Sequence, residues 1–166
     1  VVVSRQIGAW LTSTLGVAPA RVTHICNGVD VERFRPAPAH GNATGPVVIG
    51  TVGRLQTVKN QMLLVLACGQ LRRQAPERAG TWRLNLVGDG PEREALEGLA
   101  SRLYPGAEFA GELHGEALAP YFAAADLFVL PGTGGLAVQE AMSHGLPVVV
   151  AKGDGTQDDL VREKNG

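Results

Sequence analysis

The sequence predicts an α/β fold in which a parallel sheet carries helices on both faces. Short β-branched runs alternate with segments of helical spacing, and a glycine turn separates most runs from the segment that follows. The runs are almost continuously apolar, which is typical of strands covered on both faces. The 22 glycines outnumber the two Trp, two Tyr and four Phe residues without any low-complexity run, which indicates many tight turns.

The expected elements follow one another as strand–helix units. A helix near residues 5–15 and a weak strand over residues 22–26 come first. Apolar runs then predict strands over residues 46–52, 82–87 and 126–130, with a weaker strand over 107–110 and a last strand over 147–150. Helical spacing predicts helices over residues 59–74, 91–103, 117–125 and 135–144. Pro91 suits the first turn of its helix, and Gly145 suits the position just past a helix end.

One stretch of the chain has the character of a linker. Residues 33–45 are dense in Pro and Gly and have no apolar period, whereas repeated strand–helix units follow. Too few elements precede the stretch to make a domain. We therefore expect residues 1–35 to be the tail of an amino-terminal domain, residues 36–45 to be a linker, and residues 46–166 to be a second domain that is incomplete at its end.

The composition excludes several classes of protein. Apolar residues make up 45% of the chain, so intrinsic disorder is not expected. A net charge of −1 lacks the basic excess of a nucleic-acid binder, and no nucleic-acid partner is expected. The two cysteines, Cys26 and Cys68, are too few for a disulfide framework or a zinc site, and a reducing compartment is expected. No apolar run reaches the length of a membrane span, so we expect a soluble protein.

Four glycine turns follow four predicted strands, at residues 53–55, 88–91, 131–135 and 152–155. The carboxyl ends of parallel strands meet at one edge of the sheet, and ligands bind in the crevice there. Turns that lead into helices expose backbone N–H groups that favour phosphate. Each turn alone is explained by turn chemistry, but four at one edge favour a ligand site.

Charged side chains are also expected at this edge of the sheet. Arg54 is expected at the mouth of the crevice and Lys59 in the first turn of the next helix, where a cation opposes the helix dipole unless an anion is near. A guanidinium and an ammonium together can hold a diphosphate; two solvated surface cations are the alternative. Glu140 lies at the edge of the apolar stripe of its helix, where it can accept hydrogen bonds from sugar hydroxyls or simply be exposed.

Five motifs occur in order along the chain. They are NGVD with a following Phe34, VGRLQTVK, LVGDGP, ADLFVLP and EAMSHGLPVV, and they begin at residues 27, 52, 86, 125 and 140. Together they resemble the retaining glycosyltransferases that use nucleotide-sugar donors, the glycosyltransferase group 1 family. The resemblance covers the chain from about Val22 to its end.

The resemblance implies a fold and a site. The fold is the truncated carboxy-terminal half of a GT-B fold, with a Rossmann-like parallel sheet and donor binding assigned to residues 46–166. Arg54 and Lys59 match the catalytic basic pair that holds the donor diphosphate, and Glu140 matches the glutamate that binds the ribose. The remaining donor-binding positions are Gly53, His114 near the base, and Gly134, Gly135 and Leu136, whose backbone amides approach the sugar and phosphate.

One position departs from the family. A second glutamate that reaches the donor sugar is common eight residues before the Glu140 position, and here that residue is Gly132. Recognition of the sugar is therefore expected to differ from that of members with the glutamate.

The resemblance also implies a function. It is transfer of a hexose from a nucleoside-diphosphate sugar to an unknown acceptor with retention, in glycan or polysaccharide biosynthesis. No metal or other cofactor is expected. The partners are the nucleotide-sugar donor and, through the missing domain, an acceptor sugar or lipid-linked glycan; the fragment alone is expected to be inactive. The expected location is the cytoplasm, at the cytoplasmic face of the membrane if the missing domain binds there.

Two alternatives stay open at this point, a sugar-nucleotide epimerase of related fold and a non-catalytic nucleotide-binding module. A receiver-type flavodoxin-like domain fits less well. It needs an acidic cluster at the strand ends, whereas Asp126 begins its strand.

Overall fold

The computed structural model describes residues 1–30, 45–78, 80–153 and 155–162. Five parallel strands form one sheet in the order β3-β2-β1-β4-β5. They are β1 Val47–Val52, β2 Trp82–Val87, β3 Ala107–Gly111, β4 Leu127–Leu130 and β5 Val148–Val150. The chain reverses its direction of growth across the sheet between β1 and β4, as in Rossmann-like folds. The predicted fold class is confirmed.

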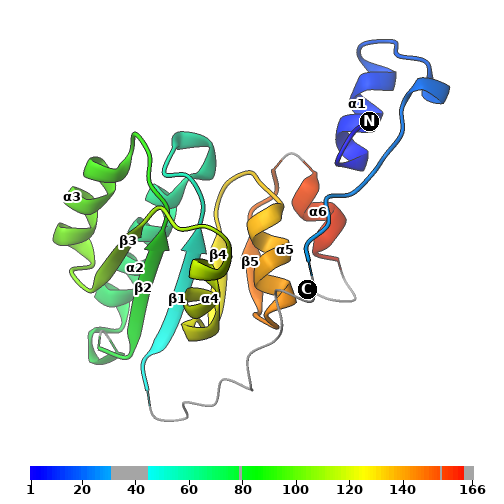
Figure 1. Cartoon of the computed structure of the whole chain (residues 1–166). Coiled ribbons are helices and arrows are strands. Elements are labelled where there is room, and N and C mark those ends of the chain that lie inside the picture. Colours follow the sequence, from blue (N-terminus) through cyan, green and yellow to red (C-terminus); the bar gives the residue numbers. More distant parts are fainter. Residues whose placement is uncertain (31–44, 79, 154, 163–166) are drawn as a thin grey trace.

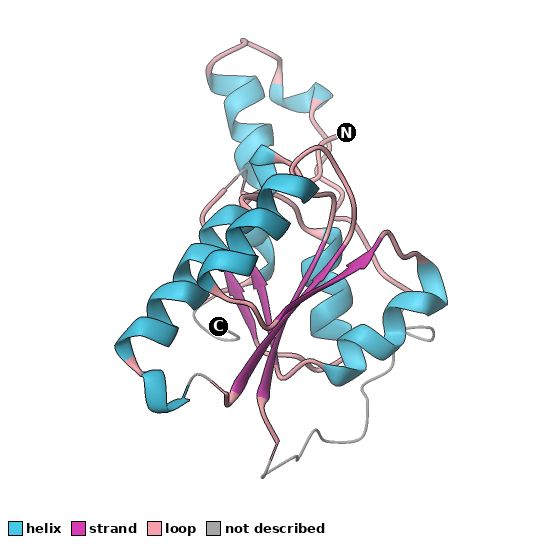
Figure 2. Cartoon of the chain, turned by 90° about the vertical axis from the view of Figure 1, so that its left-hand side faces the viewer, coloured by secondary structure: helices cyan, strands magenta, loops and turns pink. Residues whose placement is uncertain are grey.

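The helices are α1 Arg5–Ser13, α2 Gln61–Gln74, α3 Arg93–Leu103, α4 Ala119–Ala124, α5 Leu136–Ser143 and α6 Thr156–Leu160. Helices α2 to α5 cover the two faces of the sheet, whereas α1 lies apart from the sheet and contacts α6 (Figure 1, Figure 2). One buried cluster joins α2 and α3 to one face, and a second cluster joins α4 and α5 to the other. The short helix α6 was not predicted.

Alternation along the strands supplies these two cores. On β4, Phe128 and Leu130 are buried in the cluster with α4 and α5, whereas Val129 packs against the cluster with α2 and α3. On β2, Leu84 and Leu86 are buried against α2 and α3. Successive side chains of a strand point to opposite faces, so a strand in a sheet that is covered by helices on both faces needs apolar residues at every position. This requirement explains the continuous apolar runs of the sequence.

The sequence predicted the end of one helix and the start of another, and the structure confirms the first prediction only. His144 ends α5 and Gly145 follows with φ of 77°, a left-handed conformation that glycine adopts readily, so this prediction is confirmed. Pro91 was expected in the first turn of α3. The helix starts at Arg93 with Glu92 as its N-cap, and Pro91 therefore precedes the helix.

The predicted helix over residues 59–74 starts later than expected. A 3-10 turn, Thr57–Lys59, comes first, and Asn60 then adopts a left-handed conformation with φ of 54° before α2 begins at Gln61. Lys59 is therefore not in the first turn of α2, and the expected opposition to its dipole does not arise. The predicted helix over residues 117–125 is likewise divided into the 3-10 turn Gly115–Leu118 and α4.

Residues 22–26 do not form a strand of the sheet. His24 makes a single parallel bridge with Val2, beside α1. The predicted linker falls largely on residues 31–44, which lie outside the described residues. Within the described ranges, no helix combines the length and the apolar character needed to cross a membrane.

The two cysteines differ in burial, which predicts different reactivity. Burial raises the pKa of the Cys68 thiol, on α2, to about 11, whereas Cys26 is exposed. The thiolate is the reactive form, and Cys68 stays protonated at about pH 8. We expect a maleimide to modify Cys26 in the native protein and Cys68 only after denaturation, as mapped by mass spectrometry. A Cys26→Ser variant is the control, and rapid native labelling of Cys68 would contradict the burial.

Candidate functional site

A cleft of about 480 Å³ opens where β1, β2 and β4 end. Its walls come from the turns after these strands, from the segment after β3, and from the first half of α5. The N-terminal segment, residues 1–30, contributes Val3 and Asn27. The cleft therefore lies at the carboxyl edge of the parallel sheet, where the sequence predicts a ligand site.

The structure brings together every residue that the sequence analysis assigned to the site. The lining includes Gly53, Arg54, Lys59, His114, Gly134, Gly135, Leu136 and Glu140. These residues come from three separate segments of the chain, at residues 53–59, 114 and 134–140, so their meeting is a consequence of the fold.

Three of the four predicted glycine turns line the cleft, and the fourth does not. Residues 53–54, 88–89 and 134–135 supply lining residues, but no described residue of the turn at 152–155 does so. The reason is the sheet order: β5 is an edge strand, whereas β1 and its neighbours β2 and β4 surround the cleft. Thr156, the first residue of α6, is the nearest part of the chain after β5 that lines it.

Lys59 connects two walls of the cleft. Its Nζ donates a hydrogen bond of 2.7 Å to the carbonyl of Thr133. The backbone N–H of Thr133 in turn donates to the carbonyl of Val58 at 2.9 Å. The segment 131–135, hereafter the glycine loop, is thus tied to the Thr57–Lys59 turn. An ammonium group has three N–H donors, so this bond leaves donors for an anion in the cleft.

Arg54 has a fixed backbone and an exposed side chain. Its carbonyl accepts a hydrogen bond of 3.1 Å from Nε2 of Gln61, which is fully buried at the start of α2. The residue follows Gly53 directly, at the end of β1. The guanidinium is therefore carried on a rigid turn at the mouth of the cleft and can adjust to a bound group.

Gly132 brings the glycine loop against the Thr57–Lys59 turn. A Cβ added at this residue would collide with the carbonyl of Val58 and the backbone of Lys59. Glycine at this position, where the sequence departs from the family pattern, therefore lets the two backbones approach each other.

Glu140 lies one helical turn after Leu136 on α5, and both line the cleft. The carbonyl of Glu140 accepts a hydrogen bond of 2.9 Å from Nδ1 of His144. The His144 ring is buried and stacks on Phe122 with 4.9 Å between ring centroids. The helix that carries Glu140 is in this way anchored to the core.

His114 occupies the solvent-exposed rim of the cleft. Its side chain is 81% exposed, and its Nε2 lies 3.4 Å from Oε1 of Glu112. The residue belongs to the lining, as predicted, but the surrounding protein does not enclose it. In the described part of the chain, no group of three or more His, Cys, Asp and Glu side chains is arranged to hold a metal ion.

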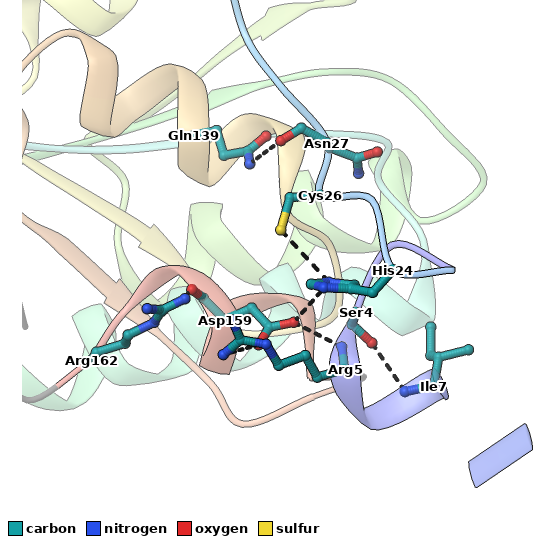
Figure 3. A network of polar contacts seen from close by, with 9 residues as sticks. All are labelled: Ser4, Arg5, Ile7, His24, Cys26, Asn27, Gln139, Asp159 and Arg162. Atoms are coloured by element: carbon teal, nitrogen blue, oxygen red, sulfur yellow. Dashed lines mark hydrogen bonds and ion pairs between the residues drawn. The ribbon is translucent and has the colours of Figure 1, made fainter. Parts of the chain in front are cut away.

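Sequence reasoning missed the residue that docks the N-terminal segment. Asp159 of α6 accepts a hydrogen bond of 2.8 Å from the backbone N–H of Arg5, the first residue of α1. Its Oδ2 also lies 3.5 Å from Nε2 of His24. Figure 3 shows these contacts around one carboxylate that is 13% exposed. Asp159 and its partners are far apart in sequence, so no local pattern identifies them.

Sequence reasoning also missed three glutamines, whose hydrogen bonds to backbone carbonyls leave no pattern in the sequence. Besides Gln61, Gln139 donates Nε2 to the carbonyl of Asn27 at 2.7 Å, and Gln157 donates Nε2 to the carbonyl of Gly132 at 2.7 Å. Each amide holds the backbone of a segment at the cleft. Figure 3 shows the bond between Gln139 and Asn27, which joins α5 to the N-terminal segment.

The close approach at Gly132 predicts the effect of a methyl group there. We expect Gly132→Ala to lower the free energy of unfolding by about 2 kcal/mol, because the loop must move away from the Thr57–Lys59 turn. Urea denaturation measures this. Gly98→Ala on α3, where an added Cβ meets nothing within 4 Å, is the control and should be neutral or stabilising. Equal stability of Gly132→Ala and the unaltered protein would contradict the contact.

The docking contact of Asp159 predicts a local effect on α1. We expect Asp159→Ala to speed hydrogen exchange of the first α1 amides about tenfold, because a charge-assisted hydrogen bond to a helix N-terminus is lost. Exchange followed by mass spectrometry measures this. The neighbouring exposed Asp158→Ala is the control. Identical exchange in α1 for both variants would show that Asp159 does not hold the segment.

Known proteins share sequence similarity with this chain. A sequence profile of the family described as "Glycosyl transferases group 1" matches residues 46–166. The chain is 35% identical over 180 residues to sulfoquinovosyl transferase SQD2 of Arabidopsis thaliana, with 100% of this chain and 33% of that protein covered. It is 32% identical over 184 residues to GDP-mannose-dependent alpha-(1-6)-phosphatidylinositol monomannoside mannosyltransferase of Mycolicibacterium smegmatis, with 99% and 47% covered.

Solved structures share the fold. Sucrose-phosphate synthase from Thermosynechococcus elongatus aligns with a TM-score of 0.77 at 28% identity, over 96% of this chain and 42% of that chain. Anabaena HepE in complex with UDP-glucose aligns with a TM-score of 0.71 at 26% identity, over 89% and 43%. The chain spans about a third to a half of the length of the curated relatives named above. Because the family profile matches more than half of its residues, the chain belongs to the glycosyl transferases group 1 family.

Proposed function

We propose that this chain is the donor-binding half of a retaining glycosyltransferase that moves a hexose from a nucleoside-diphosphate sugar to an acceptor. The observation that carries the proposal is the meeting of Arg54, Lys59 and Glu140 with the glycine loop in one cleft of a group 1 family chain. Residues 46–166 form the donor domain, residues 1–35 are the tail of the acceptor domain, and residues 36–45 link them.

The similar proteins support a nucleotide-sugar donor. HepE is solved with UDP-glucose, and the mycobacterial relative is described as GDP-mannose-dependent. These two donors differ in base and sugar but share a diphosphate bonded to the anomeric carbon of a hexose. We therefore propose that the site recognises this shared group.

The reaction breaks the bond between the anomeric carbon and the diphosphate oxygen, and it forms a bond from that carbon to an acceptor hydroxyl oxygen on the same face, while the hydroxyl proton passes to the leaving diphosphate. The nucleoside diphosphate leaves with additional negative charge. Arg54 and Lys59 stabilise this charge, because cations held in place beforehand act most strongly where charge develops. Lys59 is already positioned by its bond to Thr133. These two cations carry the charge stabilisation, so we propose a reaction without a metal.

The remaining site residues bind and orient the donor. The backbone amides of Gly134, Gly135 and Leu136 lie at the N-terminus of α5, where partial positive charge favours phosphate. The carboxylate of Glu140 accepts hydrogen bonds from the ribose hydroxyls. His114, at the exposed rim, lies on the side of the nucleotide base.

The acceptor site belongs to the part of the protein that this chain does not span. The acceptor is proposed to be a sugar or a lipid-linked glycan, bound across the cleft from the donor. This chain alone is proposed to bind nucleotide and to transfer no sugar. The reaction is placed in the cytoplasm, in glycan biosynthesis.

Loss of either cation should weaken binding of the diphosphate. We expect Arg54→Ala and Lys59→Ala each to lower the affinity for a nucleoside diphosphate about tenfold to a hundredfold, as for the loss of hydrogen bonds to a charged group. Titration calorimetry with UDP, GDP and ADP measures this. Arg73→Ala, an exposed cation at the end of α2, is the matched control. Unchanged affinity of Arg54→Ala would contradict the role of that residue.

Turnover by the full-length protein separates transfer from epimerisation. With UDP-, GDP- and ADP-hexoses, we expect a glycoside product only when an acceptor is present, with the same anomeric configuration as the donor. Nuclear magnetic resonance of the product measures both. Conversion of the nucleotide sugar to an epimer without acceptor would contradict the proposed transferase.

A further inference from the structure

Three glutamine side chains at the cleft share an unusual hydrogen-bonding arrangement. In Gln61, Gln139 and Gln157 the Nε2 group donates to a backbone carbonyl, and Oε1 is buried without a hydrogen bond from any described residue. A carbonyl only accepts hydrogen bonds, which fixes the orientation of each amide. A buried unpaired acceptor costs free energy, so an apolar side chain would be favoured if packing alone mattered. Each amide therefore stabilises the structure through the hydrogen bond that its Nε2 group donates.

In Gln157, this hydrogen-bonding arrangement holds the backbone of the glycine loop. It lies in the first turn of α6, is 1% exposed, and donates to the carbonyl of Gly132 at 2.7 Å. The chain leaves room for the amide at Gly153, because an added Cβ there would come within 3.2 Å of both its N and its O. An added Cβ at Gly135 would in turn collide with Thr156, the neighbour of Gln157. The loop and α6 are therefore in direct contact.

The glycine loop needs support from outside. Three of its five residues, Gly132, Gly134 and Gly135, are glycines, which have the largest conformational freedom to lose. Thr133 is held by Val58 and Lys59. The amide of Gln157 holds the carbonyl of Gly132, and thus two successive carbonyls of the loop are fixed by two different segments of the chain.

We propose that Gln157 is a positioning residue that orders the glycine loop for the diphosphate and sugar of the donor. It acts through the Gly132 carbonyl and does not touch the donor itself. Ordering the loop before binding lowers the entropic cost of binding, which appears as affinity. This inference rests on the proposed function of the cleft.

Two variants of Gln157 in the full-length protein test the proposal. Gln157→Met keeps the size of the side chain and removes both the donor and the unpaired acceptor. Gln157→Glu keeps the shape and places a carboxylate oxygen against the Gly132 carbonyl. Gln70→Glu, the same change on the exposed face of α2, is the matched control. Melting temperatures establish that each variant is folded, and Gln157→Met decides the test if Gln157→Glu does not fold.

The measurements are the affinities for UDP, GDP or ADP, whichever binds most tightly to the unaltered protein, and for the corresponding nucleoside. We expect Gln157→Met to bind the diphosphate about five- to tenfold more weakly, as for the loss of one hydrogen bond, and Gln157→Glu more weakly still. Affinity for the nucleoside, which has no phosphate to contact the loop, should not change in Gln157→Met. The control should bind both as the unaltered protein does.

The outcomes separate this role from the proposed function. Diphosphate affinity equal to that of the unaltered protein in folded Gln157→Met would overturn the role of Gln157 and leave the proposed function standing. An equal loss of affinity for diphosphate and nucleoside would also overturn it, since the effect would be a general disturbance of the fold. Failure of the unaltered protein to bind any of the three diphosphates would overturn the proposed function and this role with it.

Discussion

The contact between the Thr57–Lys59 turn and the glycine loop is the constraint on which the site depends. β1 and β4 are neighbours in the sheet, so the segments that follow them meet at its carboxyl edge. Gly132 has no side chain and lets the two backbones approach, and the bond from Lys59 to Thr133 then joins them. This contact sets the ammonium beside the amides of the loop. A cation and main-chain donors thereby face one space, which is the arrangement that a diphosphate requires.

Residues from outside the sheet and its helices α2 to α5 also line the cleft. Val3 and Asn27 of the N-terminal segment line it, and they are held there by Asp159 of α6 and Gln139 of α5. The N-terminal segment is thus part of the wall of the cleft.

The sequence predicted most strongly what depends on local pattern. The apolar run of β2 gave its bounds, Trp82–Val87, and the family motifs gave the cleft-lining residues Arg54 and Glu140. The predicted start of α2, at Lys59, was wrong because the left-handed conformation of Asn60 leaves no periodic signal in the sequence. Asp159 and Gln157 were missed because their partners lie far along the chain, at Arg5 and Gly132. Hydrogen bonds between distant segments follow from the tertiary fold and are not visible in local composition.

A crystal structure of the full-length protein with its best-binding nucleoside diphosphate would show whether the cleft holds the diphosphate. We expect phosphate oxygens within hydrogen-bond distance of the Arg54 guanidinium and the Lys59 ammonium, with the glycine loop in its present conformation. A nucleotide bound elsewhere, for example in the shallow groove between Met62 of α2 and Leu99 of α3, would contradict this expectation.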